Sequence, residues 1–383
     1  MNKKIYMVEL PNDVTTRVIR EEREWDAIRD DWNILYASSP YSSVPLDFVW
    51  LRGWWRVYGA IYGKAGLRVV TVRRASKLVG AIPLYVSRGV GNSLGARHLR
   101  FISTGEEEHE ETCPDYLNLL CLPGEEDVCA NAIWSEVGRM DWDHLEFLDL
   151  MEDSPLLRGI TLPHDARSFS RGSCPIADLT DGFEAYLKRL SSRGREQARR
   201  LLREGERAGA QLELVDAAQA AGAFDDLVRL HQERWTLDAK PGVFAAARFT
   251  EFHRNLIQEW LPSGRAVLAR LSLAGVSAAV QYGFVNGPKF DAYQLGARRK
   301  PGSLVHSPGI LANLLLMRAL TERGVTACDF LRGSSPYKRR QATRENQLVG
   351  VQIWRPTLRA AIHRSRQLAA RVFNKGQRLM RRG

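Results

Sequence analysis

The chain is poor in cysteine. Its 383 residues include five, and none belongs to a C-x-x-C pair: Cys113, Cys121, Cys129, Cys174 and Cys328. An odd, scattered set of cysteines argues against a disulfide framework. The first three are eight residues apart, which is not the spacing of a metal site. We therefore predict packed thiols, no metal, and a cytoplasmic location.

Long apolar runs are also missing. No stretch approaches the about 20 apolar residues that a membrane-spanning helix needs. Met1–Tyr6 carries lysines but no long apolar segment behind them, so we predict no signal peptide. With 44% hydrophobic and 26% charged residues, the composition is that of a globular protein. The length suffices for two domains or for one large domain.

Acidic residues are absent from the last part of the chain. Residues 355–383 contain nine lysines and arginines and no acid, which leaves +2 of the formal net charge of +11 for residues 1–354. Apolar residues such as Leu358, Ile362 and Phe373 are spread among them. This tail is predicted to be either a basic amphipathic helix at the inner membrane surface or a disordered basic segment.

What the chain does contain is a recurring order of elements. In the second half, Ala274-Gly275 separates two alternating segments, which is typical of a hairpin. Gly309–Arg323 carries apolar residues at helical spacing and is followed by Gly324. The strands expected around this helix are Arg265–Leu273, Val276–Val285, Lys289–Leu295, Thr326–Leu331 and Leu348–Trp354.

The first half repeats this order more loosely. Asp149 takes the place there of Asp329 in the second half. The expected elements are strands at Leu67–Arg73, Lys77–Tyr85 and Tyr116–Cys121, a helix at Glu125–Arg139 and a strand at His144–Leu150.

Two helices are expected between the halves, at 182–207 and at Ala217–Trp235. Arginines of the first, including Arg193 and Arg199-Arg200, are interleaved with glutamates. Such a helix is either a solvated face with i,i+4 ion pairs or a contact for tRNA or an anionic sugar.

Reactive side chains gather between Ser307 and Lys338. Ser307-Pro308-Gly309 suits a helix N-cap, a first-turn proline and a glycine that permits close approach. The unpaired N–H groups of a helix start favour anions such as phosphates, although a plain cap has the same residues. The next strand ends in Asp329, with Arg332-Gly333 and Tyr337-Lys338 after it.

These residues carry a resemblance to a family. The segment from Leu190 to Trp354 resembles the BioF2-like acetyltransferase domain, a branch of the GNAT superfamily named alongside the CelD cellulose-biosynthesis proteins. The N-terminal part, from Pro45 through Tyr58-Gly59, also resembles the start of such proteins. The matching pieces stand in the family order: Ser192-Arg193, Arg199-Arg200, Leu230–Trp235, Gly242–Phe244, Ser307–Gly309, Asp329–Gly333 and Tyr337-Lys338.

The family is similar to the FemAB ligases, which pair two GNAT-like domains. The resemblance therefore implies an α/β (α+β) fold with mixed sheets, arranged as two tandem GNAT-like domains at 1–170 and 171–354 and a basic helical tail at 355–383. It also implies two central strands that splay apart and hold acyl-CoA in the notch between them. That notch would lie between Lys289–Leu295 and Thr326–Leu331.

The implied co-substrate is acetyl-CoA or another acyl-CoA, without a metal. The usual pyrophosphate loop of the superfamily, Gln/Arg-x-x-Gly-x-Gly/Ala, is matched only in part by Arg299–Leu304. FemAB-like relatives use aminoacyl-tRNA instead. The expected cofactor-binding residues are Arg299, Gly302, Ser303, His306, Ser307 and Gly309.

Three residues are catalytic candidates. Asp329 is expected to act as a base or to orient another group, or else to pair with Arg332 or Lys338. Tyr337 would protonate the leaving thiolate, as tyrosine does in many relatives, or else pack on the strand edge. His231 is a secondary candidate, because a histidine on an amphipathic helix is often a satisfied structural residue.

Four further residues are expected to bind substrate. Tyr293 and Gln294 would line the acceptor pocket, or else only pack. Arg332 would clamp a carboxylate or phosphate, and Lys338 would bind an anionic group. Their structural alternatives are an ion pair for Arg332 and a solvated surface position for Lys338.

The sequence thus predicts a GNAT-type N- or O-acyltransferase acting on a sugar, an amine or a surface-polysaccharide precursor. A link to cellulose or exopolysaccharide biosynthesis follows from the family association alone. One alternative is a FemAB-like aminoacyl-tRNA-dependent transferase, whose basic helix and tail would contact phosphates. The other is a catalytically degenerate GNAT scaffold.

Overall fold

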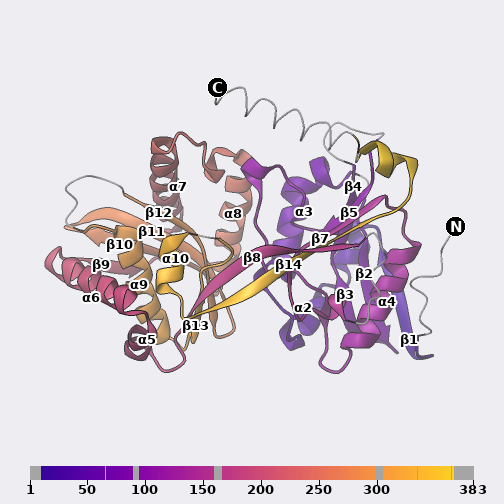
Figure 1. Ribbon diagram of the computed structural model, residues 1–383, viewed down its shortest axis with the longest axis horizontal. Coiled ribbons are helices and arrows are strands. Elements are labelled where there is room, and N and C mark those ends of the chain that lie inside the picture. The colour runs from indigo at the N-terminus through magenta and orange to yellow at the C-terminus, as the bar shows by residue number, and fades with distance from the viewer. Residues whose placement is uncertain are drawn as a thin grey trace. The chain divides into compact units, whose positions relative to one another are not determined.

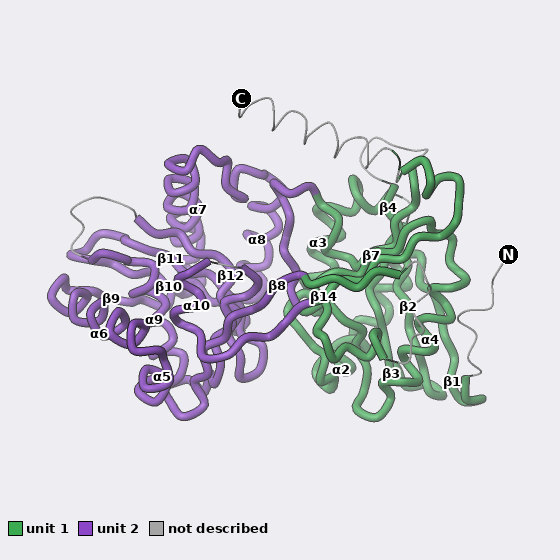
Figure 2. The backbone as a smooth tube through the Cα atoms, viewed as in Figure 1, with its two compact units in different colours: residues 1–106, 116–170, 349–383 green, residues 107–115, 171–348 purple. Residues whose placement is uncertain are grey.

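The computed structural model describes residues 10–64, 66–88, 95–158, 166–298, 305–333, 335–363 and 365 (Figure 1). The chain divides into two compact units (Figure 2). Unit 1 contains residues 1–106, 116–170 and 349–383, and unit 2 contains residues 107–115 and 171–348. Each unit therefore includes a segment from the other half of the sequence. No helix in the described ranges is long and apolar enough to cross a membrane.

Unit 1 holds strands in two sheets. The first has the order β1-β2-β3-β6, and its neighbouring strands are antiparallel. In the second, β4 is antiparallel to β5, and β5 is parallel to β7. The strands are β1 Val14–Ile19, β2 Val69–Arg74, β3 Lys77–Ile82, β4 Leu84–Ser87, β5 His98–Phe101, β6 Leu120–Cys121 and β7 His144–Met151. The helices are α1 Glu22–Asp26, α2 Arg29–Ser38, α3 Phe48–Tyr62 and α4 Glu126–Arg139, with short 3₁₀ turns at Val44–Leu46 and Pro155–Leu157.

A proline divides one of the expected strands. We predicted a single strand at Lys77–Tyr85, but β3 ends at Ile82 and β4 begins at Leu84. Pro83 between them has no N–H to donate to a neighbouring strand. Because β3 pairs with β2 and β4 pairs with β5, the chain passes from one sheet to the other at this proline.

The strand predicted at Tyr116–Cys121 is shorter than expected. Strand β6 is only Leu120–Cys121, and it pairs with β3. The parallel partner of β7 is β5, His98–Phe101. This strand has four residues, which is too short for an alternating pattern to reveal it.

Unit 2 is built on a mixed sheet in the order β8-β13-β12-β11-β10-β9. β12 and β13 are parallel, and the other neighbours are antiparallel. The strands are β8 Arg167–Asp178, β9 Gln211–Leu214, β10 Ala266–Leu273, β11 Val276–Asn286, β12 Lys289–Ala297 and β13 Ala327–Asp329. The helices are α5 Phe183–Arg189, α6 Ser192–Arg207, α7 Ala220–Leu237, α8 Ala247–Trp260, α9 Pro308–Thr321 and α10 Pro336–Gln341, with short turns at Glu108–Glu110 and Val243–Ala245. Strand β14, Arg344–Trp354, begins in unit 2 and ends in unit 1.

The order expected from the sequence recurs in both units. A hairpin, a helix and a parallel strand follow one another as β4-β5, α4 and β7 in unit 1, and as β11-β12, α9 and β13 in unit 2. The mixed α/β fold predicted from the sequence is confirmed.

The predicted helix at 182–207 is two helices. α5 ends at Arg189, and α6 begins at Ser192. The Ser191 hydroxyl accepts a hydrogen bond from the Gly194 N–H over 3.2 Å and so caps the start of α6. A capping serine inside a charged run is hard to recognise, because the flanking residues continue the helical pattern.

Both faces of β12 are covered by helices that approach closely. A Cβ on Gly309 at the start of α9 would lie 2.9 Å from Leu295 of β12. A Cβ on Gly296 of the same strand would lie 2.6 Å from the carbonyl oxygen of Leu227 in α7. Since neighbouring strand residues point to opposite faces, α9 and α7 enclose β12 from the two sides. Glycine is required at both positions to allow this spacing.

The start of the expected tail packs on unit 1. The Arg355 guanidinium donates to the carbonyl oxygens of Met140 and Gly138, at 2.7 and 2.8 Å, and lies over the ring of Trp142. Residues 358–363 are helical. Residues 364 and 366–383, with most of the predicted tail, lie outside the described residues.

Candidate active site

The two parallel strands of unit 2 separate after three residue pairs. β12 and β13 are paired from Lys289 and Ala327 to Asp291 and Asp329. Beyond this point β12 continues to Ala297, whereas β13 has ended. The strands therefore open into a notch at the place where the resemblance implied one.

A bulge marks β12 just inside the notch. Tyr282 of β11 lies opposite Gln294, and Gly283 lies opposite Ala292, so that Tyr293 is the extra residue. A bulge turns the local backbone and interrupts the regular ladder of hydrogen bonds. Tyr293 is therefore left out of the regular pairing with β11.

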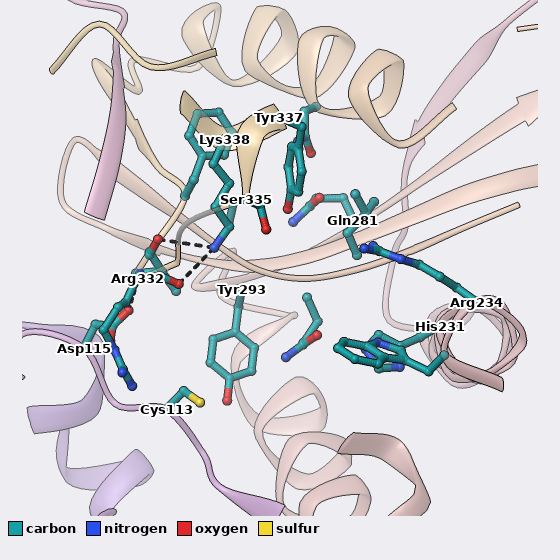
Figure 3. A pocket seen from close by; sticks show the side chains of 17 residues that line it. Cys113, Asp115, His231, Arg234, Gln281, Tyr293, Arg332, Ser335, Tyr337 and Lys338 are labelled. Carbon is teal, nitrogen blue, oxygen red and sulfur yellow. Dashed lines mark hydrogen bonds and ion pairs between the residues drawn. The ribbon is translucent and has the colours of Figure 1, made fainter. Parts of the chain in front are cut away.

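A cavity of about 250 Å³ lies in the notch (Figure 3). All the residues that line it belong to unit 2. They come from β11 and β12, from the turn after β13, from α7, α9 and α10, and from the segment 107–115. The lining residues are Cys113, Asp115, His231, Arg234, Trp235, Gln281, Ala292, Tyr293, Gln294, Leu295, Asn313, Phe330, Leu331, Arg332, Ser335, Tyr337 and Lys338.

Tyr337 points its hydroxyl into this cavity from α10, near Gln281 and Ser335 (Figure 3). Burial raises the pKa of the Tyr337 phenol above its usual value, whereas the nearby Arg234 lowers it by a smaller amount. The phenol is therefore protonated at neutral pH. A neutral hydroxyl at the wall of a cavity is a proton donor for a group bound there.

His231 lines the same cavity, but its ring nitrogens are occupied. The indole N–H of Trp235 lies 2.8 Å from Nε2, and Oε1 of Gln232 lies 3.2 Å from Nδ1. Since the indole can only donate, Nε2 is the acceptor and Nδ1 carries the proton. Burial lowers the pKa of His231 to about 4. These contacts favour the structural alternative for His231 over a role as a base.

Asp329 is fully buried at the base of the notch and does not line the cavity. Lys289 lies 3.7 Å from its carboxylate and 2.9 Å from that of Asp291. Burial raises the pKa of Asp291 to about 6, although the Lys289 ammonium opposes this shift. Within the described residues Lys289 is thus an ion partner of Asp329, whereas the structural alternative had named Arg332 or Lys338.

Asp329 also shapes the turn that follows β13. Its Oδ1 accepts a hydrogen bond from the Leu331 N–H over 2.8 Å. Leu331 has a φ of 58°, a left-handed conformation that is unfavourable for leucine. The resulting turn directs the carbonyl oxygens of Leu331 and Arg332 to Nζ of Lys338, at 3.3 and 3.1 Å. Asp329 therefore positions Lys338 at the wall of the cavity.

Arg332 is held by acids of the segment 107–115. Its backbone N–H donates to Asp115 over 2.6 Å, its Nε donates to the same carboxylate over 3.2 Å, and Glu111 lies at 3.8 Å. The same segment accepts a hydrogen bond at the Thr112 carbonyl from the Tyr293 hydroxyl over 2.5 Å. Arg332 therefore has acidic partners that are far away in the sequence, Asp115 and Glu111, where the structural alternative had named Asp329.

The expected cofactor residues are placed only in part. Arg299, Gly302 and Ser303 lie outside the described residues. His306, Ser307 and Gly309 lie at the start of α9 but do not line the cavity. The Ser307 side chain forms no cap hydrogen bond. All four expected substrate-binding residues, together with Tyr337 and His231, do line the cavity: Tyr293, Gln294, Arg332 and Lys338.

Several lining residues were not predicted as site residues. Gln281 and Asn313 are 2% and 4% exposed and bring amides to the cavity, and Ser335 adds a hydroxyl. Arg234 lies in the Leu230–Trp235 motif that carried the family resemblance, so the sequence could have indicated it as a site residue. Nothing in the sequence indicated Cys113 and Asp115 as site residues, because they are more than a hundred residues away in sequence from the other lining residues.

Comparisons with known proteins agree with this geometry. A sequence profile described as "Acetyltransferase (GNAT) domain" matches residues 192–339. No curated protein matches the chain. Among the solved structures, FemX has a TM-score of 0.58 at 12% identity, covering 83% of this chain and 95% of FemX.

Two further structures share the fold. A conserved protein of unknown function from Bacteroides thetaiotaomicron has a TM-score of 0.57 at 11% identity, covering 88% of this chain and 100% of that protein. The C-terminal domain of a candidate lysylphosphatidylglycerol synthetase from Agrobacterium fabrum has a TM-score of 0.52 at 12% identity, covering 88% and 95%. At such identities the likeness concerns the fold.

The splayed strands, the bulge and the repeated order of elements define a GNAT-type fold built twice along one chain. Residues 192–339 match the acetyltransferase (GNAT) domain, and the fold of the chain is the tandem, FemAB-like one expected from the sequence. Within the described ranges, no group of histidine, cysteine and acidic residues is arranged to hold a metal ion.

Proposed function

We propose that unit 2 transfers an acyl group from an acyl-CoA to an amine or hydroxyl of a second substrate. The observation that carries this proposal is the notch between β12 and β13, with the Tyr337 hydroxyl directed into its cavity. When bound, the acyl-CoA supplies the thioester carbonyl that the acceptor attacks. The bulged backbone at Tyr293 would donate N–H groups to the oxygen that becomes negative.

Tyr337 is the proposed general acid. Its proton would pass to the sulfur as the carbon–sulfur bond breaks and the new bond to the acceptor forms. The proton that the acceptor loses would return to the Tyr337 phenolate through solvent, so that the products are the acylated acceptor and the free thiol. A phenol whose pKa is raised by burial keeps this proton at neutral pH. Asp329 has a positioning role in this proposal, because its carboxylate faces Leu331 and Lys289 rather than the cavity.

The start of α9 fits the phosphates of the donor. The Ser307 side chain does not cap α9, and Gly309 brings the helix close to β12. Backbone N–H groups at a helix N-terminus bind phosphate. His306 and Ser307 therefore remain the proposed cofactor-binding positions, together with Arg299, Gly302 and Ser303.

For the acceptor we propose a small polar molecule, such as a sugar, an amine or a surface-polysaccharide precursor. The amides of Gln281, Gln294 and Asn313 and the hydroxyl of Ser335 suit hydrogen bonding to it. The link to polysaccharide synthesis and contact of the tail with a membrane rest on the family resemblance and on the basic sequence of residues 355–383.

The test is calorimetric binding of acetyl-CoA and longer acyl-CoAs to the purified protein. Ser335→Trp would fill the cavity without removing a side-chain cap, and we expect it to abolish binding of the acyl group. Ser192→Trp, on the exposed start of α6, is the matched control. Gly309→Glu is unsuitable, because its side chain would collide with Leu295 and disturb the fold. Absence of binding for every acyl-CoA would refute this donor.

A second candidate donor is aminoacyl-tRNA. Two observations favour it: the fold extends over 95% of FemX, and α6 exposes Arg193, Arg199, Arg200, Arg203 and Arg207. Charged tRNA would then bind with an affinity that falls steeply with salt. Replacing Arg199 and Arg203 by Gln should flatten this dependence by roughly two phosphate contacts, whereas acyl-CoA binding should not change.

A further inference from the structure

The cavity carries more positive than negative charge. Three cationic side chains and one acidic side chain line it: Arg234, Arg332, Lys338 and Asp115. His231 adds no charge, because burial lowers its pKa to about 4. Asp115 is bound to Arg332, and Glu111 supports the same guanidinium. Two cations therefore remain to be neutralised.

Arg234 and Lys338 are these two cations. In the described part of the chain, neither has an acidic side chain within ion-pair distance. Nζ of Lys338 donates to two backbone carbonyls, which leaves one of its three ammonium hydrogens for another partner. The Arg234 guanidinium lies 6.0 Å from the ring of Trp235, the neighbouring residue, and extends into the cavity opposite Lys338 (Figure 3).

A cation that is withdrawn from water without a counter-charge is unfavourable, and a bound anion relieves this penalty. Burial is the largest influence on the pKa of the Lys338 ammonium and lowers it below the usual value, although Asp115 and Asp329 oppose this shift. The cavity is thus prepared for a ligand that brings a negative charge.

We propose that the cavity binds a carboxylate or phosphate group of the substrate between Arg234 and Lys338, close to the site of acyl transfer. This inference rests on the proposed function for the reaction, and it narrows the substrate to one with an anionic group near its reacting centre. Arg234, which takes no part in the ion pairs around Arg332, is the specificity-determining residue. In this proposal Arg234, rather than Arg332, has the anion-binding role that the sequence predicted for Arg332.

The inference can be tested without turnover. Saturation-transfer NMR would compare three small probes of similar size: glycerol 3-phosphate, glycerate and neutral glycerol. We expect one or both anionic probes to bind at least about tenfold more tightly than glycerol, the range of a charge-assisted hydrogen-bonded pair. A preference for the phosphate probe would indicate a phosphorylated substrate, and a preference for glycerate a carboxylate substrate.

Variants identify the residues. Arg234→Gln should weaken binding of the anionic probe about tenfold or more, whereas Arg234→Lys should retain part of it. Arg229→Gln is the matched control, because Arg229 is on the same helix, is exposed and pairs with Asp226 and Glu233 outside the cavity. Lys338→Met is a second, independent variant with the same expectation as Arg234→Gln. Circular dichroism would confirm that each variant is folded.

Two results would overturn the inference: glycerol binding as tightly as the anions, or Arg229→Gln weakening binding of the anions as much as Arg234→Gln. Because no acyl transfer is measured, failure of the transferase activity would leave this result intact. Conversely, if the anionic probes do not bind, the proposed acyl-CoA binding at α9 can still be tested independently by calorimetry.

Discussion

Trp235 lies one helical turn after His231 in α7, and its indole N–H donates to Nε2 of His231 over 2.8 Å. This bond uses the lone pair that a general base would need. With Gln232 at the other nitrogen, the imidazole is held neutral and in one tautomer. The pairing explains how a histidine can line the cavity and still be part of its scaffold.

Trp235→Phe should raise the pKa of His231 from about 4 towards its usual value, because the donor that favours the neutral ring is lost. NMR titration of the histidine ring protons would measure this shift. Trp260→Phe, in α8, is the control and should leave the His231 titration unchanged. A wild-type His231 that titrates near pH 6.5 would contradict the proposed tautomer and restore His231 as a candidate base.

Tyr337→Phe should lower kcat for acyl transfer by about 10²- to 10⁴-fold, the usual contribution of a general acid, with KM for the donor little changed. Release of free thiol would follow the reaction. Tyr293→Phe is the matched control: it removes the hydrogen bond to the Thr112 carbonyl and should reduce stability by about 1 kcal/mol, with a smaller effect on kcat. An equal loss of kcat in both variants would argue against Tyr337 as the acid.

Lys289→Met should lower the free energy of unfolding by about 3–5 kcal/mol, because it leaves two buried carboxylates without their cation. Burial alone would lower the pKa of Lys289, but Asp291 and Asp329 hold it above its usual value. Urea unfolding would measure the loss. Adding Asp291→Asn should recover part of it, and a loss below about 1 kcal/mol would show that the three charges are not coupled.

Unit 1 should lose stability in mild acid. The Nδ1 atoms of His98 and His144 are 2.9 Å apart, and burial lowers the two pKa values to about 2 and about 3. These values lie below the about 6.5 of an unfolded histidine, so the unfolded chain binds more protons below that pH. Stability is therefore full above about pH 6.5 and falls as the pH decreases towards 3.

Each of these histidines contributes a slope of up to about 1.4 kcal/mol per pH unit in this range. His98→Gln should remove about one such slope when unfolding is measured by urea at several pH values between 5 and 7. His109→Gln is the control, because His109 is exposed and contacts Glu107. A slope that His98→Gln does not change would show that His98 is protonated in the folded protein.

The strands of the second half followed from their alternating patterns, and β10, β11 and β12 lie within one or two residues of the predicted ranges. The segment 107–115 could not be foreseen, because Asp115 and Arg332 are brought together only by the fold. The same holds for Lys289, whose two acidic partners lie on different strands. Sequence patterns indicate which side chains are buried, but they do not indicate which charges face one another across parallel strands.

The discontinuity of both units has a consequence for biosynthesis. Unit 1 includes the last residues of β14, from Val349 on, so it cannot be completed until these residues have left the ribosome. Unit 2 in turn needs Asp115, which is made long before β12 and α10. A nascent chain that is arrested before residue 349 therefore lacks part of one unit, and the segment 192–339 expressed alone lacks the acids that hold Arg332.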